Sequence, residues 1–378
     1  MPPSQDPMNS VPAQAAPVAP PSPIAEKSSS PQRTWMLLAG IAAIVVIGAA
    51  IYWFAPQKES ASVVPKKIGI ANFVQGSSSV TGLKKGLAEL GYSDVEFFGG
   101  EVIPNPKMIE EIKAIYRKAI EENDVDLLFA DHEHQALAAV EITREMGVDV
   151  PIVFISRFHD PVSYGIVESF KSSGNNATGI TQNLTEVASR IYNFLREINP
   201  SLKKVSVFGG GFLIPGVADD DYFEAMKEEA DRLGIELIEY RSSVPPPQAE
   251  AEFNRVADTI KKGDVDGIFH LPGHFYESQQ VAEYQLAKRL GIPMHAPYED
   301  LGSEGVEGGG HFAYTANFAH AGEQAARMVD KIFRGMKPSE IPLEYGEQNL
   351  LVLEKGRAEE TGIKFSESML FLADEVRE

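Results

Sequence analysis

The sequence predicts an α/β protein with two Rossmann-like lobes, whose parallel sheets are joined by a hinge, preceded by one N-terminal transmembrane helix. Short apolar runs alternate with segments of helical periodicity from residue 66 onward, which is typical of parallel sheets covered by helices. The alternation occurs twice, and corresponding segments lie about 140 residues apart. An apolar run of 21 residues without a charge precedes the first copy.

The N-terminal part divides into three segments by composition. Residues 1–34 are rich in Pro, Ala and Ser, so we expect a disordered tail. Residues 35–55, "WMLLAGIAAIVVIGAAIYWFA", have aromatic residues at both ends and are long enough at ~1.5 Å per residue to cross ~30 Å of hydrocarbon. A cleaved signal peptide has a shorter apolar core, of roughly 7–15 residues. We therefore expect an uncleaved transmembrane anchor, followed by a linker over residues 56–65.

Charge and cysteine content exclude several classes of protein. The formal net charge is −20, which repels phosphate backbones, so nucleic acid is not an expected partner. The chain has no cysteine, which excludes disulfides, thiolate catalysis, Cys-ligated zinc and a lipid anchor on Cys.

The folded part begins near residue 66. Apolar, β-branched runs predict strands at residues 67–73, 125–130, 152–156, 205–209, 235–240 and 267–271. Apolar residues recur at helical spacing over 80–90, 187–198 and 253–260.

The duplication predicts two similar lobes. "KKIGIANF" at 66 corresponds to "KKVSVFGG" at 203, and "DVDLLFA" at 124 corresponds to "DVDGIFH" at 264. We assign residues 66–181 to the first lobe and 182–312 to the second. A single large doubly wound sheet is the alternative, but it would not explain the duplication.

Binding residues are expected beyond the carboxyl ends of the strands, where ligands of open parallel sheets bind. If the two lobes face each other, these ends meet in one cleft. The candidate ligand-binding residues in the loops there are Ser77, Ser78, Ser79, Asp131, His132, His134, Gln135, Arg157, Phe158, His159, Asp160, Phe212, His274, Phe275, Tyr298 and Asp300.

These residue types suit a small polar or aromatic ligand. Arg157 offers a planar fork for a carboxylate or phosphate. Three serines precede a helix start, where free N–H groups favour anions. Phe212 and Phe275 offer rings for stacking.

Structural roles are open for the same residues. Arg157 could pair with neighbouring Asp160, and Asp160 could start a turn before Pro161. Asp131 could cap the following helix and leave His132 and His134 on its exposed first turn, and one of the serines could be an N-cap.

Enzyme motifs are not found. The sequence lacks a nucleophile elbow, a phosphate-binding Gly-Lys-Thr/Ser loop and His-Glu-x-x-His, and "VFGGGF" lacks the dinucleotide spacing, so we expect no enzyme and no cofactor. Residues 131–134 carry metal-ligand types, but adjacent residues in a turn seldom point one way. A metal site would need His159 or the second lobe.

Two segments resemble a known family. "IVFISRFHDPVSYGIVES" (152–169) and "GNNATGIT" (174–181) resemble the ABC-transporter substrate-binding proteins of the tryptophan/tyrosine-binding type, which have the type I periplasmic-binding-protein fold. "QNLLVLEKGRAEETGI" (348–363) resembles the closing segment of that family. The Asp-His-Glu-His loop at 131–134 and Arg157-Phe158-His159 depart from the small residues usual there, and Asn175 replaces a usual glycine.

The resemblance implies a particular chain path and function. The chain would return to the first lobe over about 313–336 and finish on the second over about 337–366. The family implies an extracytoplasmic protein, here anchored in the cell membrane, that captures an amino-acid-like solute between its lobes for an ABC permease. The alternatives are a ligand-sensing module for a membrane partner and a metal-binding protein or enzyme.

Overall fold

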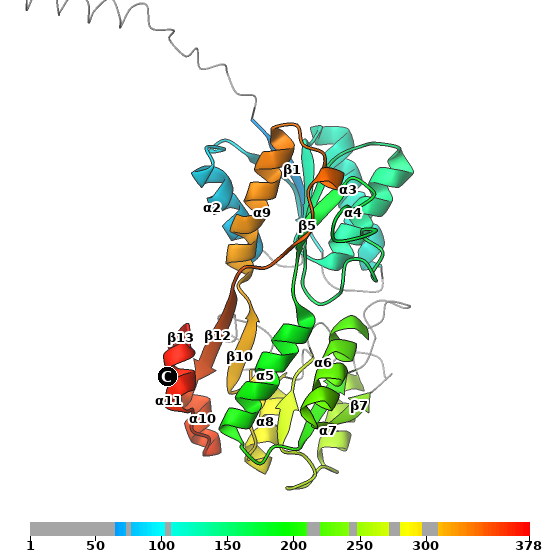
Figure 1. Ribbon diagram of the computed structural model, residues 1–378. Coiled ribbons are helices and arrows are strands. Elements are labelled where there is room, and N and C mark those ends of the chain that lie inside the picture. Colours follow the sequence, from blue (N-terminus) through cyan, green and yellow to red (C-terminus); the bar gives the residue numbers. More distant parts are fainter. Residues whose placement is uncertain are drawn as a thin grey trace, which may run out of the picture. The chain divides into compact units, whose positions relative to one another are not determined.

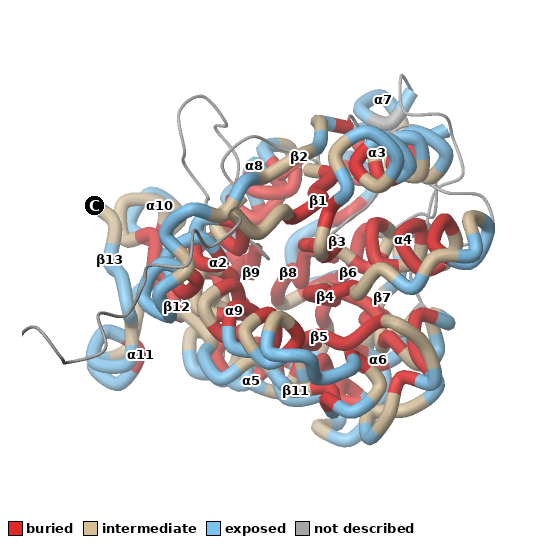
Figure 2. Tube along the Cα trace, turned by 90° about the horizontal axis from the view of Figure 1, so that it is seen from above, coloured by how far each residue is buried: buried red, intermediate tan, exposed pale blue. Residues whose placement is uncertain are grey.

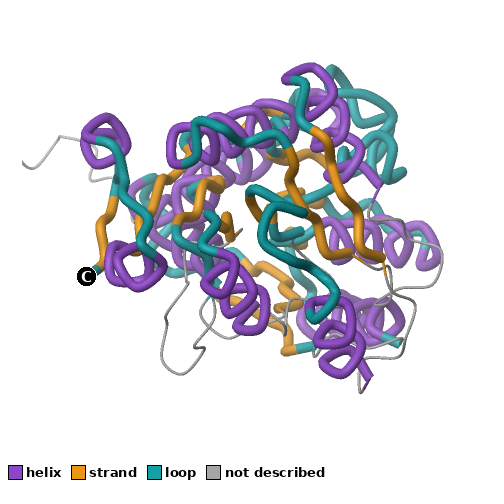
Figure 3. The backbone as a smooth tube through the Cα atoms, turned by 90° about the horizontal axis from the view of Figure 1, so that it is seen from below, coloured by secondary structure: helices purple, strands orange, loops and turns teal. Residues whose placement is uncertain are grey.

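The computed structural model describes residues 65–72, 77–102, 107–209, 220–241, 248–271, 280–296 and 309–378. Within this part of the chain the strands form two sheets, flanked by helices (Figures 1 and 3). The expected transmembrane segment, residues 35–55, lies outside the described residues. Among the helices that are described, none combines the length and the apolar character needed to cross a bilayer.

The first sheet has six strands in the order β11-β5-β4-β3-β1-β2. Each neighbouring pair is parallel. Its strands are β1 (Lys67–Asn72), β2 (Glu96–Glu101), β3 (Leu127–Ala130), β4 (Ile152–Ser156), β5 (Ala177–Thr181) and β11 (Glu344–Tyr345).

The second sheet has seven strands in the order β13-β12-β10-β9-β8-β6-β7. Its neighbours are parallel except β10 and β12, which are antiparallel. Its strands are β6 (Lys204–Gly209), β7 (Glu236–Arg241), β8 (Gly267–Phe269), β9 (Met294–Ala296), β10 (Phe312–Ala316), β12 (Asn349–Glu354) and β13 (Glu375–Arg377).

Helices cover both faces of the first sheet. One core cluster joins the sheet to α3 (Met108–Asn123) and α4 (Glu133–Met146). The cluster on the other face joins it to α2 (Ser78–Glu89) and α9 (Phe318–Phe333). The strands between these layers are apolar and buried, as Figure 2 shows for β3 and β4.

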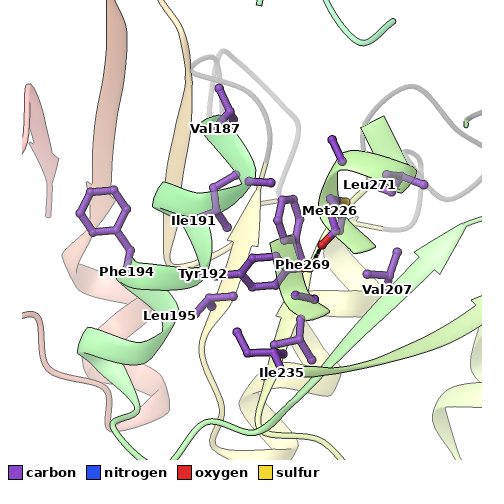
Figure 4. Close-up of a cluster of buried hydrophobic side chains, with 14 of the residues drawn as sticks. Val187, Ile191, Tyr192, Phe194, Leu195, Val207, Met226, Ile235, Phe269 and Leu271 are labelled. Atoms are coloured by element: carbon purple, nitrogen blue, oxygen red, sulfur yellow. Dashed lines mark hydrogen bonds between the residues drawn. The ribbon is translucent and has the colours of Figure 1, made fainter. Parts of the chain in front are cut away.

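The second sheet is covered in the same way. Helices α5 (Leu184–Ile198) and α6 (Asp220–Leu233) pack on one face, and α7 (Ala249–Ala257) and α8 (Gln280–Leu290) on the other. Figure 4 shows the first of these clusters, where the hydroxyl of Tyr192 donates to the carbonyl of Met226 at 3.1 Å. Val187, Ile191 and Leu195 line one stripe of α5, and each such burial stabilises the fold by ~1.5–3 kcal/mol.

Short C-terminal elements complete the described chain. The 3₁₀ helix η3 (Pro338–Glu340) precedes β11, and α10 (Lys355–Thr361) and α11 (Glu367–Leu372) lie between β12 and β13.

The chain passes from one sheet to the other after β5, after β10 and after β11. The return near residue 313 shifts to Asn317, because β10 pairs in the second sheet and the Asn317 side chain caps α9. The chain was expected to leave the first lobe for the second near residue 336. It leaves only after Tyr345, since β11 pairs with β5 of the first sheet. The second lobe extends past 366, because β13 pairs with β12.

Helices α2 and α9 lie side by side on the first sheet, although they are far apart in sequence (Figure 1). A Cβ on Gly82 would lie 1.8 Å from the carbonyl oxygen of Ala319, and one on Gly322 would lie 2.0 Å from that of Ser79. Only glycine permits this approach, so the two helices touch backbone to backbone.

The segment "GNNATG" has a structural role. Gly174 has a φ of +71°. The side-chain amide of Asn175 donates to the carbonyl of Ile166 at 2.7 Å, and that of Asn176 donates to the carbonyl of Val150 at 2.6 Å. These bonds set β5 beside β4. The segment therefore marks the fold and not the ligand.

Candidate functional site

Three loops at the carboxyl ends of β1, β3 and β4 lie together. They carry the serines at 77–79, the residues 131–135 and the residues 157–160. Because β1 pairs with β3 and β3 with β4, all in parallel, their carboxyl ends share one edge of the sheet. The expectation that these loops meet at a strand edge agrees with the structure.

Ser77, Ser79, Asp131 and Arg157 form one hydrogen-bonded cluster. The hydroxyls of Ser77 and Ser79 donate to Oδ2 of Asp131 at 2.5 and 3.2 Å. Nη2 of Arg157 donates to the Ser79 hydroxyl at 3.0 Å and to Asp131 Oδ2 at 3.3 Å. Nε of Arg157 donates to the backbone carbonyl of Asp131 at 2.8 Å. Asp131 is 4% exposed, so this is a buried ion pair.

The guanidinium of Arg157 has a further neighbour. Its Cζ lies 4.1 Å from the ring centroid of Phe318, the first residue of α9. This cation–π contact fixes the plane of the guanidinium.

The open structural roles are now decided for these residues. Arg157 pairs with Asp131 and not with Asp160. Asp160 instead accepts the backbone N–H groups of Val162 and Ser163 at 2.8 and 3.1 Å, as expected for a turn. Asp131 does not cap α4, because His132 occupies the N-cap position.

The serines at 77–79 differ in burial. Ser77 is the N-cap residue of α2, but its side chain makes no cap hydrogen bond and bonds Asp131 instead. Ser79 is fully buried, and Ser78 is partly exposed at the first residue of α2.

Two side chains in the first turn of α4 hydrogen-bond the backbone of the cluster. Gln135 accepts the backbone N–H of Asp131 at 2.8 Å. Glu133 accepts the backbone N–H of Arg157 at 2.9 Å. Both side chains are fully buried, so the two loops are tied through the start of one helix.

Three histidines gather next to Glu133. The rings of His132 and His134 stack at 4.8 Å, and those of His134 and His159 are 6.1 Å apart. Nδ1 of His134 hydrogen-bonds the Tyr164 hydroxyl. Nε2 of His159 lies 3.9 Å from Oε1 of Glu133.

Burial and charge oppose each other at Glu133. Burial alone raises the pKa of this carboxyl, but His132, His159, His134 and the N–H of Arg157 outweigh it and lower the pKa to about 2. Burial lowers the pKa of His132, although Glu133 works against that shift. Glu133 is therefore ionised at neutral pH.

The second lobe contributes Asp221 and Tyr222, from the first turn of α6. The carboxylate of Asp221 accepts the Asp160 backbone N–H at 3.0 Å and the Ser163 hydroxyl at 2.7 Å. It also lies 3.6 Å from Nδ1 of His159. The ring of Phe158 meets that of Tyr222 edge to face at 6.3 Å.

The candidates expected from the second lobe lie outside the described residues: Phe212, His274, Phe275, Tyr298 and Asp300. A polar group close to those segments is described: His270, which follows β8, is fully buried and bonds Glu283 at 2.9 Å.

Sequence reasoning missed several members of the site. Tyr164, Asp221, Tyr222 and Phe318 were not among the candidates. The run "ADDDYF" before a helix was an available signal for Asp221. Phe318 carries no local signal, since its place depends on the return of the chain to the first lobe.

Comparison with known proteins decides the family. The family described as "ABC transporter substrate binding protein" matches residues 67–377. The chain belongs to this family. The resemblance stated from the sequence is confirmed, and with it the type I periplasmic-binding-protein fold. The family is one of substrate-binding proteins rather than enzymes.

Relatives are distant in sequence. A "Tyrosine-binding protein" of Clostridioides difficile (strain R20291) is 22% identical over 289 residues, covering 76% of this chain and 78% of that protein. A conserved domain protein from Vibrio cholerae matches with a TM-score of 0.66 and 23% identity over 83% of this chain and 100% of its own. An ABC domain from Streptococcus pneumonia, in complex with L-Trp, matches with a TM-score of 0.65 and 20% identity over 82% and 99%.

Proposed function

We propose that this substrate-binding protein is anchored in the cell membrane by residues 35–55 and captures a small amino-acid-like solute between its lobes for an ABC permease. The observation that carries the proposal is the buried pair of Asp131 and Arg157, flanked by two serine hydroxyls at the start of α2.

The pair is complementary to a zwitterion. A solute carboxylate would take the Arg157 guanidinium, the serine hydroxyls and the N–H groups at the start of α2. A solute ammonium would take the Asp131 carboxylate. Arg157 and Asp131 bond each other at 3.3 Å. An amino acid offers a carboxylate in place of Asp131 and an ammonium in place of Arg157.

The surroundings suit a ring on the same solute. Phe318 contacts the Arg157 guanidinium, the ring of Phe158 meets that of His132, and Tyr164 packs against His159. The C. difficile relative is named for tyrosine and the S. pneumonia protein holds L-Trp, which supports an aromatic amino acid here too.

The mechanism is hinge closure without covalent chemistry. A solute that binds the closed form better shifts the population toward it. Asp221 and Tyr222 contact the loops of the first lobe, so α6 would close over a solute held by Arg157. The closed form would then be presented to the permease.

A thermal-unfolding screen of the purified full-length protein tests the solute class. An amino acid that binds should stabilise the protein by ~2.7 kcal/mol at 100 times its dissociation constant. The matched controls are the same side chain without the carboxylate and without the amine, for example tryptamine and indolepropionate beside tryptophan. The proposal is wrong if both truncated compounds stabilise the protein as well as the amino acid does.

A further inference from the structure

The histidines beside the cluster of Asp131 and Arg157 lie close enough, with Glu133, to hold a metal ion after small rearrangements. One ligand atom each from His132, Glu133 and His134 lies within 4.8 Å of the other two. His159 adds Nε2 at 3.9 Å from Oε1 of Glu133. Ligands of a tetrahedral zinc ion stand about 3.3 Å apart, because each bond is ~2.0–2.2 Å long. Side-chain rotations that shorten the distances among the His132, Glu133 and His134 atoms by about 1.5 Å or less would bring these three to that spacing.

Glu133 supplies an independent indication. The side chain is fully buried, and its Oε2 accepts the backbone N–H of Arg157. Its Oε1 makes no hydrogen bond with any residue that the structure describes. A buried carboxylate oxygen without a hydrogen bond is costly, and a cation bound there would satisfy it.

The outer contacts of two histidines match those of metal ligands. A metal-bound imidazole usually gives its other nitrogen to a carboxylate, a carbonyl or a similar group, which fixes its tautomer. Nδ1 of His159 faces the Asp221 carboxylate at 3.6 Å while Nε2 faces Glu133. Nδ1 of His134 bonds the Tyr164 hydroxyl.

The local charge also favours a dication. Asp131, Glu133 and Asp221 carry three negative charges, and Arg157 carries one positive charge. With neutral imidazoles the group therefore has a net charge of 1 − 3 = −2. A divalent ion would neutralise it.

We propose that His132, Glu133, His134 and His159 form a site for a divalent transition-metal ion such as Zn²⁺. The donors are three imidazoles and one carboxylate, which favour Zn²⁺, Ni²⁺ or Cu²⁺ over Mg²⁺ and Ca²⁺. Asp221 of the second lobe orients His159. The site does not use the Arg157 guanidinium or the serines, although it shares His132 and Asp221 with the surroundings of the proposed solute.

Titration of the chelator-treated full-length protein with Zn²⁺ tests the site. Calorimetry should show one tight site per chain, with Mg²⁺ giving no comparable heat. Co²⁺ should give the visible d–d bands of a low-coordinate nitrogen and oxygen site. Absence of Zn²⁺ binding by the wild-type protein would overturn the proposal.

Variants separate this site from adventitious binding. Asp221→Asn should weaken Zn²⁺ binding by ~10–100-fold, as expected for an outer contact, and His134→Ala and Glu133→Gln by at least as much. His320→Ala removes a histidine that pairs with Glu347 on the first lobe and should leave Zn²⁺ affinity unchanged. Equal Zn²⁺ affinity in the wild type, His134→Ala and Asp221→Asn would refute the assignment. His134 is only partly buried and Asp221 lies on the other lobe, so misfolding of Glu133→Gln alone leaves the test intact.

Discussion

Replacing Arg157 with alanine should destabilise the fold as well as weaken solute binding. The substitution removes the guanidinium that bonds the Asp131 carboxylate and carbonyl at 3.3 and 2.8 Å. It also removes the contact with the Phe318 ring. Arg157 lies in a loop, but its partner Asp131 is buried, so we expect the substitution to affect stability.

The magnitude follows from the charge that stays behind. Removing one partner of a buried ion pair costs about 3–5 kcal/mol. Asp131 keeps the hydroxyls of Ser77 and Ser79, so we expect the lower end, about 3 kcal/mol of unfolding free energy. The matched control is Arg334→Ala, whose side chain is 70% exposed and pairs with Asp330 at 2.8 Å. That surface pair should be worth only about 0–1 kcal/mol.

Urea unfolding followed by far-UV circular dichroism measures these differences. Tryptophan fluorescence is unsuitable, since Trp35 and Trp53 both precede the described residues. A second substitution gives a test of sign: adding Asp131→Asn to Arg157→Ala removes the unpaired charge, so the double variant should be more stable than Arg157→Ala alone. A double variant that is less stable than the single one would refute the buried-pair reasoning.

Three further predictions concern helix packing, pH and the membrane. Gly82→Ala should cost about 1–3 kcal/mol of unfolding free energy despite its better helix propensity, because its Cβ would lie 1.8 Å from a carbonyl oxygen. Gly346→Ala, where the Cβ meets open space, should cost almost nothing in the same urea titration. Burial lowers the pKa of His295 and of His311 from 6.5 to about 3. The unfolded chain therefore binds more protons below pH 6.5, and stability should fall by up to ~1.4 kcal/mol per pH unit for each histidine as the pH drops toward 3. His295→Leu should lose less stability than the wild type between pH 7 and 5, and an equal loss would contradict the shift. The intact chain should stay with membranes through high-salt washing while a chain starting at Ser62 is soluble and binds the same solute, and a natural soluble form cleaved near residue 55 would disprove the anchor.

The strands of the first lobe could be predicted because they are buried on both faces. A short, β-branched apolar run such as residues 152–156 favours a buried parallel strand over a helix. Strands β2 and β5 were missed, since "EFFGGE" and "ATGIT" contain glycines and few large apolar residues. Strand β12 was also missed, and its antiparallel pairing with β10 depends on where the chain crosses between lobes.

The sequence predicts where the site lies but not which of its side chains bond each other. The rule for parallel strands brought residues 131 and 157 to one edge of the sheet. It did not identify the partner of Arg157: the sequence suggested only the neighbouring Asp160, whereas the structure pairs Arg157 with Asp131. Burial decided the pairing, and burial depends on α9 and its Phe318, which arrive from the far end of the chain.

The glycine contact between α2 and α9 sets the order in which the lobes can be completed during synthesis. Helix α2 is made early, but its partner begins at Phe318, after all of the second sheet except β12 and β13. At ~5–20 residues per second, ribosomes need on the order of ten seconds to pass from residue 181 to residue 318. For that interval α2 alone is available to cover the face of the first sheet that it later shares with α9. The packing of this face is therefore complete only after the chain has passed through the second sheet and α9 has been made.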